Sequence, residues 1–213
     1  MIEKILPAAV AVAESRHDSP DSVLFPEEEA VIARAVDKRR REFTTVRDCA
    51  RRALAELGLP PAPILPGERG APQWPAGVVG SMTHCEGYRA AAVARSGDVR
   101  ALGIDAEPHG PLPDGVLDAV SLPTELGRLS GLRAAAPDVH WDRLLFSAKE
   151  SVYKAWFPLT GEWLGFEDAD VALLPDGTFS ARILLGRPGR PTGFTGRWLV
   201  ADGVAATAVT DHR

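Results

Sequence analysis

Two short segments carry the side chains most able to do chemistry. Asp105 and Glu107 are separated by one residue, and about 45 residues later Glu150 stands among the lysines Lys149 and Lys154. Carboxylate oxygens are the ligands that a hard divalent cation prefers, and such a cation binds phosphate groups that amines also attract. The two segments therefore indicate phosphoryl-group chemistry, provided that the fold brings them together.

The acidic pair lies at the end of an expected strand. In an extended chain, side chains two residues apart point to the same side, so Asp105 and Glu107 would present two carboxylates together. Carboxylates so close repel each other unless a cation sits between them. The simpler interpretation is a strand that ends in solvent before Pro108, and the pair alone leaves both interpretations open.

The glutamate flanked by lysines lies in an expected helix. Glu150 and Lys154 are one turn apart and share a helix face, which on an open surface would make an ordinary ion pair. Large apolar residues surround them, among them Phe146, Tyr153 and Trp156. Charges embedded among such groups favour a position at the mouth of a cleft.

The composition limits the classes of function. The chain has 213 residues, of which 45% are apolar and 25% charged, and its net charge is −5. That length is sufficient for one large domain or two small lobes with a shared core. The negative charge argues against nucleic acid or an anionic membrane as a partner. No apolar run is long enough to span a membrane, and the two cysteines, Cys49 and Cys85, favour the reducing cytoplasm.

Apolar periodicity and turn signals predict short strands and several helices. Strands are expected at residues 5–12, 78–83, 88–95, 99–105, 171–174, 178–185, 194–201 and 204–210. Helices are expected at residues 26–57 with a break near Asp37, at 114–120 and 123–135, and at 141–157 with an end at Pro158. The acids of residues 27–29 are interpreted only as charges that favour a helix start. Helices combined with hairpin-linked strands indicate an α+β fold.

The two segments together resemble the signature of a known family. The pattern G-[IV]-D-x-E, followed some 40 residues later by [FW]-[SC]-x-K-E-[SA]-x-x-K, is similar to that of the 4′-phosphopantetheinyl transferases. Within them, the chain resembles the class that activates peptide and polyketide synthetases, the surfactin and enterobactin synthetase activators, and especially the enterobactin-type enzymes of actinobacteria. Upstream blocks at residues 39–51, 67–75 and 80–85 extend the resemblance, which covers residues 26–172.

The resemblance implies a reaction and an architecture. Coenzyme A would donate its 4′-phosphopantetheine arm to a serine hydroxyl of an apo acyl or peptidyl carrier protein, with Mg²⁺ as cofactor and 3′,5′-ADP as the leaving product. The fold would consist of two similar lobes related by a pseudo-twofold axis, residues 1–106 and 107–213. Each lobe would be a small, mostly antiparallel sheet with helices, with the active site between the lobes. A monomer is expected.

The resemblance also implies roles for individual residues. Asp105, Glu107 and Glu150 would hold the metal, and Glu150 would also accept the serine proton, directly or through a water. Lys154 and His84 would complete the catalytic group. Coenzyme A would be bound by a larger set of side chains, namely Arg39, Arg47, Arg69, Ser81, Thr83, His84, Lys149, Tyr153 and Lys154, with Arg51 in reserve.

Two other functions fit parts of the pattern. A Mg²⁺-dependent pyrophosphohydrolase acting on coenzyme A-like nucleotides would use the same acids and cations but would transfer the group to water. A non-catalytic nucleotide- or carrier-binding module is harder to reconcile with three carboxylates and two lysines.

Overall fold

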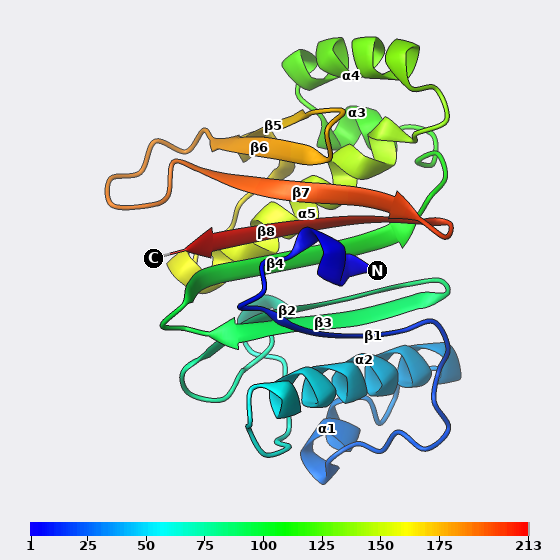
Figure 1. Ribbon diagram of the computed structural model, residues 1–213, viewed down its shortest axis with the longest axis vertical. Coiled ribbons are helices and arrows are strands. Elements are labelled where there is room, and N and C mark those ends of the chain that lie inside the picture. Colours follow the sequence, from blue (N-terminus) through cyan, green and yellow to red (C-terminus); the bar gives the residue numbers. More distant parts are fainter. Residues whose placement is uncertain (213) are drawn as a thin grey trace.

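Two antiparallel sheets form the framework of the protein (Figure 1). The computed structural model describes residues 1–212. The smaller sheet has the strand order β1 (Ala11–Ser15), β3 (Tyr88–Arg95), β2 (Val78–Cys85). The larger sheet has the order β4 (Val99–Pro108), β8 (Val204–His212), β7 (Gly193–Ala201), β6 (Thr178–Ile183), β5 (Ala169–Leu173). The predicted α+β class is therefore confirmed.

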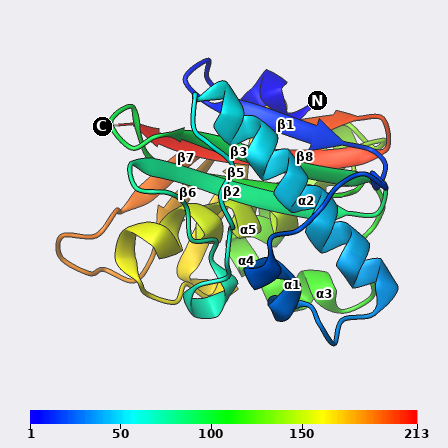
Figure 2. The same cartoon turned by 90° about the horizontal axis from the view of Figure 1, so that it is seen from below.

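The helices cover the sheets. They are α1 (Pro26–Val31), α2 (Asp37–Glu56), α3 (Val116–Val120), α4 (Pro123–Ala135) and α5 (Trp141–Thr160). Short 3₁₀ turns occupy Ile2–Ile5, Glu68–Gly70 and Phe166–Asp168. Figures 1 and 2 show α2 lying across the smaller sheet and α5 crossing behind β4 and β8. Each sheet thus carries one 20-residue helix. No helix within residues 1–212 is long and apolar enough to cross a membrane.

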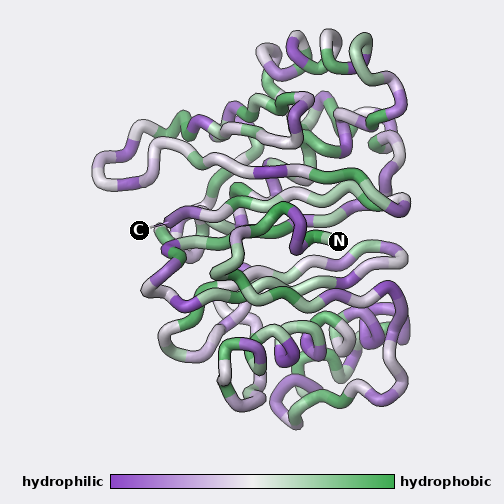
Figure 3. The backbone as a smooth tube through the Cα atoms, in the orientation of Figure 1, coloured by the Kyte–Doolittle hydropathy of each residue, from purple (hydrophilic) through white to green (hydrophobic). Residues whose placement is uncertain are grey.

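Apolar stripes fix these two helices in place. In α2 the buried residues recur at three- and four-residue intervals, including Ala50, Ala53 and Leu54, which pack on the smaller sheet. In α5 the stripe includes Leu145 and Val152, which pack on the larger sheet. This spacing matches one face of a helix with 3.6 residues per turn. Figure 3 shows stretches of hydrophobic colour along strands of both sheets.

The predicted end of α5 at Pro158 is wrong. The helix includes Pro158 and continues to Thr160, where Gly161 adopts a left-handed conformation with φ of 67°. The Gly161 N–H donates to the Phe157 carbonyl at 2.8 Å and closes the last turn. A proline removes only one backbone hydrogen bond so near the end, and glycine is the residue that best terminates a helix in this way.

The first predicted strand is also shifted. Residues 2–5 form a 3₁₀ turn, and the strand itself is β1, which pairs with β3 from Ala11 to Ser15. Pro7 separates the two elements. Because β1 is an edge strand of the smaller sheet, its outer part is half-exposed and includes Glu14 and Ser15. The apolar run of residues 5–12 therefore overlaps the paired segment only at residues 11 and 12.

The predicted boundary between residues 106 and 107 falls inside a strand. Both residues belong to β4, which pairs with β8 along most of its length. The chain passes from the smaller sheet to the larger one at the turn of residues 96–98, between β3 and β4. Asp105 and Glu107 therefore lie on the same strand of the larger sheet.

Candidate active site

The two sheets meet where β2 lies beside β4. The strands do not pair through their backbones, and side-chain hydroxyls connect them instead. Ser81 Oγ accepts a hydrogen bond from the Ile104 N–H, and Thr83 Oγ1 accepts one from the Ala106 N–H, each at 3.0 Å. These two predicted coenzyme A ligands are buried, and part of their hydrogen-bonding capacity is used to join the sheets. The Ser81 hydroxyl still has a proton that it can donate, whereas the Thr83 hydroxyl donates its proton to Asp105 Oδ1.

The acidic pair lies on the side of β4 that faces α5. Asp105 is 5% exposed, and its Oδ1 accepts from Lys154 Nζ at 2.7 Å. Thr83 Oγ1 lies 3.4 Å from the same oxygen. Asp105 Oδ2 is buried and has no hydrogen-bond partner within residues 1–212. A buried carboxylate oxygen without a partner is costly, so this atom calls for a cation or a donor that the chain itself does not provide.

Glu107 is tied to the first turns of α5. Its Oε2 accepts from Arg143 Nη1 at 3.1 Å. Arg143 also donates to the carbonyls of Gly110 and Pro111, which fixes the loop after β4. Burial raises the pKa of Glu107, the Asp105 charge raises it further, and Arg143 opposes both effects.

Glu150 and Lys154 project from α5 toward β4. Burial raises the pKa of Glu150, Lys154 opposes this rise, and the Asp105 charge adds to it. The Lys154 ammonium contacts the Ile104 carbonyl at 3.2 Å as well as Asp105. The predicted meeting of the two segments is therefore present in the structure.

The three carboxylates fit a divalent cation without forming a closed cage. Asp105 raises the pKa of both other acids, so the three negative charges act on one another. No group of three His, Cys, Asp or Glu side chains in the described chain is drawn together tightly enough to count as a preformed metal site. Since Mg²⁺ keeps several waters and is usually held by one or two carboxylates plus phosphates, an open arrangement with an unpartnered Asp105 oxygen suits it.

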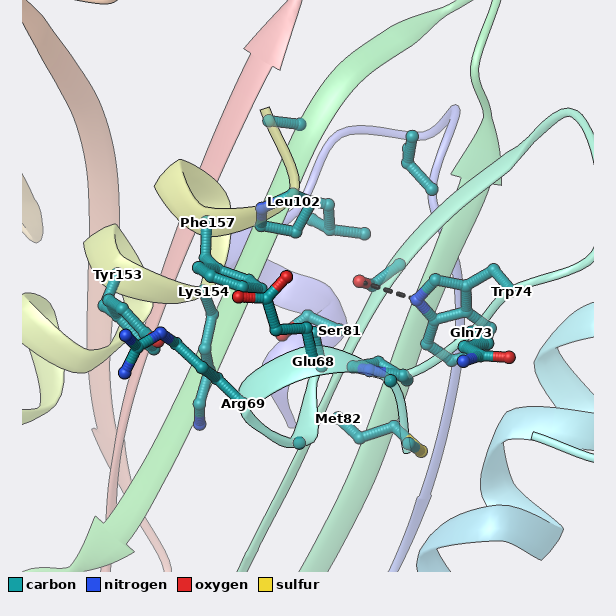
Figure 4. A pocket seen from close by; sticks show the side chains of 18 of the residues that line it. Glu68, Arg69, Gln73, Trp74, Ser81, Met82, Leu102, Tyr153, Lys154 and Phe157 are labelled. Carbon is teal, nitrogen blue, oxygen red and sulfur yellow. Dashed lines mark hydrogen bonds between the residues drawn. The ribbon is translucent and has the colours of Figure 1, made fainter. Parts of the chain in front are cut away.

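A pocket of about 700 Å³ opens beside this acidic group. Its walls come from residues 67–74, from β2, from the start of β4 and from α5. Figure 4 shows Arg69 and Tyr153 at one side, with Lys154 between them and Ser81. The Arg69 guanidinium lies 5.2 Å from the Trp163 ring, and the Tyr153 and Trp163 rings are 5.1 Å apart. The pocket thus combines cations at one end with an aromatic wall.

Two further predicted residues meet on the outer side of β2. Arg39 belongs to α2, and His84 lies near the end of β2. Nη1 of Arg39 is 2.6 Å from Nε2 of His84. Burial and then the charge of Arg39 lower the pKa of His84, while Glu42 opposes them. The convergence of a guanidinium and an imidazole from different elements suits a phosphate group.

Arg47 lies apart from this group. It is 5% exposed, its guanidinium stacks on the Phe43 ring, and its Nε donates to the Ile64 carbonyl at 3.0 Å. Burial lowers the pKa of Arg47 to about 10, an effect that Glu28 opposes. Its assignment to coenzyme A stays a prediction, and its placement gives it a packing role.

The interpretation of Glu28 as a simple helix-start charge is wrong. The side chain is completely buried and forms an ion pair with Arg51 at 3.0 Å. It also accepts the N–H groups of Phe25 and Ile64. Glu28 therefore connects α1, α2 and the connector after α2. The burial of Glu28 depends on partners that are distant in sequence. The run of acids at residues 27–29 therefore gave no sign of it.

Lys149 does not reach the pocket, which corrects its assignment as a phosphate ligand. Its Nζ forms an ion pair with Glu125 at 2.8 Å and donates to the carbonyls of Phe166 and Ala169. These three contacts use all three ammonium protons. Burial lowers the pKa of Lys149, and Glu125 opposes this. Lys149 instead fixes α5 to α4 and β5.

Replacement of Lys154 should affect transfer activity, whereas replacement of Lys149 should affect stability. Lys154→Met is expected to abolish transfer, because it removes the cation beside Asp105 and the pocket. Lys149→Met is expected to leave the KM for coenzyme A unchanged but to destabilise the protein by about 3–5 kcal/mol, because Glu125 is left buried without a counterion. Transfer kinetics and thermal unfolding of both variants measure this. Adding Glu125→Gln to Lys149→Met should recover stability, and a raised KM in that double variant would contradict the assignment.

Sequence reasoning missed two polar side chains at the site. Arg143, which holds Glu107, lies seven residues before Glu150 and hence on the same face of α5, so helical periodicity offered a signal. Glu42, which lies 3.8 Å from His84 Nδ1, is three residues after Arg39 on α2. It stood within a run of basic residues and gave no distinct signal.

Comparison with known proteins agrees with this geometry. A family model described as the 4′-phosphopantetheinyl transferase N-terminal domain matches residues 27–94, and one described as the 4′-phosphopantetheinyl transferase superfamily matches residues 101–208. The second covers β4 and α5, which carry the acidic group.

Relatives cover nearly the whole chain. The chain is 60% identical to 4′-phosphopantetheinyl transferase Svp of Streptomyces mobaraensis, over 98% of its own length and 88% of the relative. It is 53% identical to 4′-phosphopantetheinyl transferase PptT of Mycobacterium tuberculosis, over 98% and 97%. Enterobactin synthase component D of Escherichia coli (strain K12) is 35% identical over 59% of each chain. With such coverage, the chain belongs to the 4′-phosphopantetheinyl transferases, enzymes that transfer the phosphopantetheine arm of coenzyme A to apo carrier proteins.

Proposed function

We propose that this transfer depends on Mg²⁺ held by Asp105, Glu107 and Glu150, and that 3′,5′-ADP is the leaving product. The observation that carries the proposal is the buried Asp105 Oδ2, which has no partner within residues 1–212, together with the effect of the Asp105 charge on Glu107 and Glu150. When held by these carboxylates, such an ion would supply positive charge that offsets the negative charge on the departing phosphate.

The cations of the site are assigned to the phosphates. Lys154 lies between Asp105 and the pocket, so its ammonium can contact the pyrophosphate. Arg39 and His84 form a second cationic position on the other side of β2, which suits another phosphate of coenzyme A. Positioned charges of this kind supply most of the stabilisation in phosphoryl transfer.

The pocket is assigned to the pantetheine arm. Tyr153 and Phe157 form its apolar wall, and Arg69 stands at its mouth. Ser81 accepts a hydrogen bond from β4 and retains its hydroxyl proton, so it can still donate to the nucleotide. The Thr83 hydroxyl donates to Asp105, so it could contact the nucleotide only by giving up that bond.

Glu150 is assigned a shared role as metal ligand and base. The serine oxygen of the carrier attacks one phosphorus of the pyrophosphate, and a new P–O bond forms. The bond from that phosphorus to the bridging oxygen breaks, and 3′,5′-ADP leaves with the electron pair. Glu150 accepts the serine proton directly or through a water. It has no hydrogen-bond donor among the described side chains, and burial raises the pKa of this carboxylate, which makes it a stronger base.

Incubation with coenzyme A, Mg²⁺ and an apo carrier protein tests the proposal, followed by intact-mass measurement of the carrier. We expect a mass gain equal to one phosphopantetheine group, 3′,5′-ADP in the supernatant and loss of both after chelation of Mg²⁺. Consumption of coenzyme A without a mass gain would indicate a pyrophosphohydrolase instead. We also propose a cytoplasmic location, supported by the two free cysteines, Cys49 and Cys85.

A further inference from the structure

The His84 ring is held between two side chains of α2. Arg39 Nη1 lies 2.6 Å from Nε2, and Glu42 Oε2 lies 3.8 Å from Nδ1 on the other side of the ring. Arg39 and Glu42 are three residues apart and therefore share one face of the helix. The imidazole thus has a cation at one nitrogen and an anion near the other.

These neighbours define which nitrogen carries the proton. A guanidinium only donates hydrogen bonds, so Nε2 of His84 must accept when Arg39 contacts it. The single proton of the neutral imidazole is then on Nδ1, which faces Glu42. In this state Nε2 has no proton to offer to a phosphate.

Glu42 is the anionic neighbour of the His84 ring. The residue is 8% exposed, and no hydrogen bond to its carboxylate is found within residues 1–212. Its one ionic neighbour in that range is His84, which is a counterion only when protonated. A nearby opposite charge favours the charged form of a titratable group, so the Glu42 carboxylate stabilises the imidazolium form of its neighbour.

We propose that Glu42 is a positioning residue that stabilises protonated His84, so that binding of coenzyme A is coupled to the uptake of one proton by the imidazole. Arg39 leaves Nε2 and contacts the incoming phosphate, and the new Nε2–H of His84 donates to the same phosphate while Nδ1–H faces Glu42. The proton comes from solvent. The inference rests on the proposed assignment of Arg39 and His84 to a phosphate of coenzyme A.

The charges around His84 give the direction of the pH effect. Burial, Arg39, Lys154 and Arg89 lower the pKa of the imidazole, and Glu42 opposes them. The free enzyme therefore favours the neutral form of His84. A phosphate brings negative charge to within hydrogen-bond distance of Nε2 and draws Arg39 toward itself, and both changes favour the imidazolium.

Titration of the histidine ring signals by NMR, with and without coenzyme A and in the absence of carrier protein, measures this coupling. His84→Gln identifies the His84 signal among the five histidines. In the wild type we expect coenzyme A to raise the pKa of His84 by at least about one unit, a tenfold gain in proton affinity. In Glu42→Gln, which keeps the shape of the side chain without its charge, the rise should be clearly smaller.

A matched control is Glu56→Gln, which removes an exposed carboxylate from the end of the same helix. This variant should titrate like the wild type. If coenzyme A binds but leaves the pKa of His84 unchanged, or if Glu42→Gln behaves like Glu56→Gln, the inference is wrong while the proposed function stands. If the wild type fails to bind coenzyme A at all, the proposed function itself fails.

Discussion

Asp105→Asn is expected to lower the rate of phosphopantetheine transfer by at least about 10²–10³-fold, with the fold retained. The amide has nearly the shape of the carboxylate, so packing against Thr83 and α5 is preserved. It lacks the negative charge that forms an ion pair with Lys154 and that would bind the cation at Oδ2. Excess Mg²⁺ should not restore the rate, because the missing group is a ligand. Transfer rates over a range of Mg²⁺ concentrations and the unfolding temperature measure both effects.

Asp98→Asn is the control for this prediction. Asp98 lies exposed in the turn between β3 and β4, so the same chemical change occurs in the same part of the chain without touching the site. It should keep normal transfer. Near-normal activity of Asp105→Asn would exclude the metal assignment, and so would a full recovery at high Mg²⁺.

Local signals predicted most elements well. The bounds expected for α4, residues 123–135, are those observed, because a proline at its first position and a clear apolar pattern mark it. The hairpin of β7 and β8 was expected from the turn at Asp202 and Gly203, and both residues have positive φ. Signals of this kind lie within a few neighbouring residues, which is why the sequence alone reveals them.

The orientation of the lysines shows what periodicity can add. On an ideal helix Glu150 and Lys154 are separated by about 40°, whereas Lys149 and Lys154 are separated by about 140°. A helix that presents Glu150 and Lys154 to the pocket therefore turns Lys149 away from it. Family resemblance assigned both lysines to phosphate, and the helix geometry separates them.

Tertiary pairing explains what remained hidden. The joint between β2 and β4 uses hydroxyls of Ser81 and Thr83 in place of backbone pairing, and no local pattern distinguishes such a contact from an ordinary strand residue. The burial of Glu28 and Arg47 likewise depends on the connector at Ile64, which lies far from Glu28 in sequence. Partners distant in sequence leave no periodic trace.

The glycine of the acidic segment explains how β4 and α5 come close enough to share a site. A Cβ at Gly103 would lie 2.0 Å from the Ser151 carbonyl oxygen and 2.8 Å from the Ala155 backbone nitrogen. Both atoms belong to the backbone of α5, so no side-chain rotation could relieve the overlap. The helix therefore packs directly on the strand only because residue 103 has no side chain.

Gly103→Ala is therefore expected to separate α5 from β4, with a loss of stability of about 1–3 kcal/mol or more and a large loss of transfer. The activity loss follows because Glu150 and Lys154 move away from Asp105. Unfolding temperature and transfer rate at a temperature where the variant is folded distinguish the two effects. Gly97→Ala, in the turn before β4, has no atom within 4 Å of the added carbon and should change neither quantity. A normal transfer rate in the folded Gly103→Ala enzyme would show that the three carboxylates align without close packing of α5 on β4.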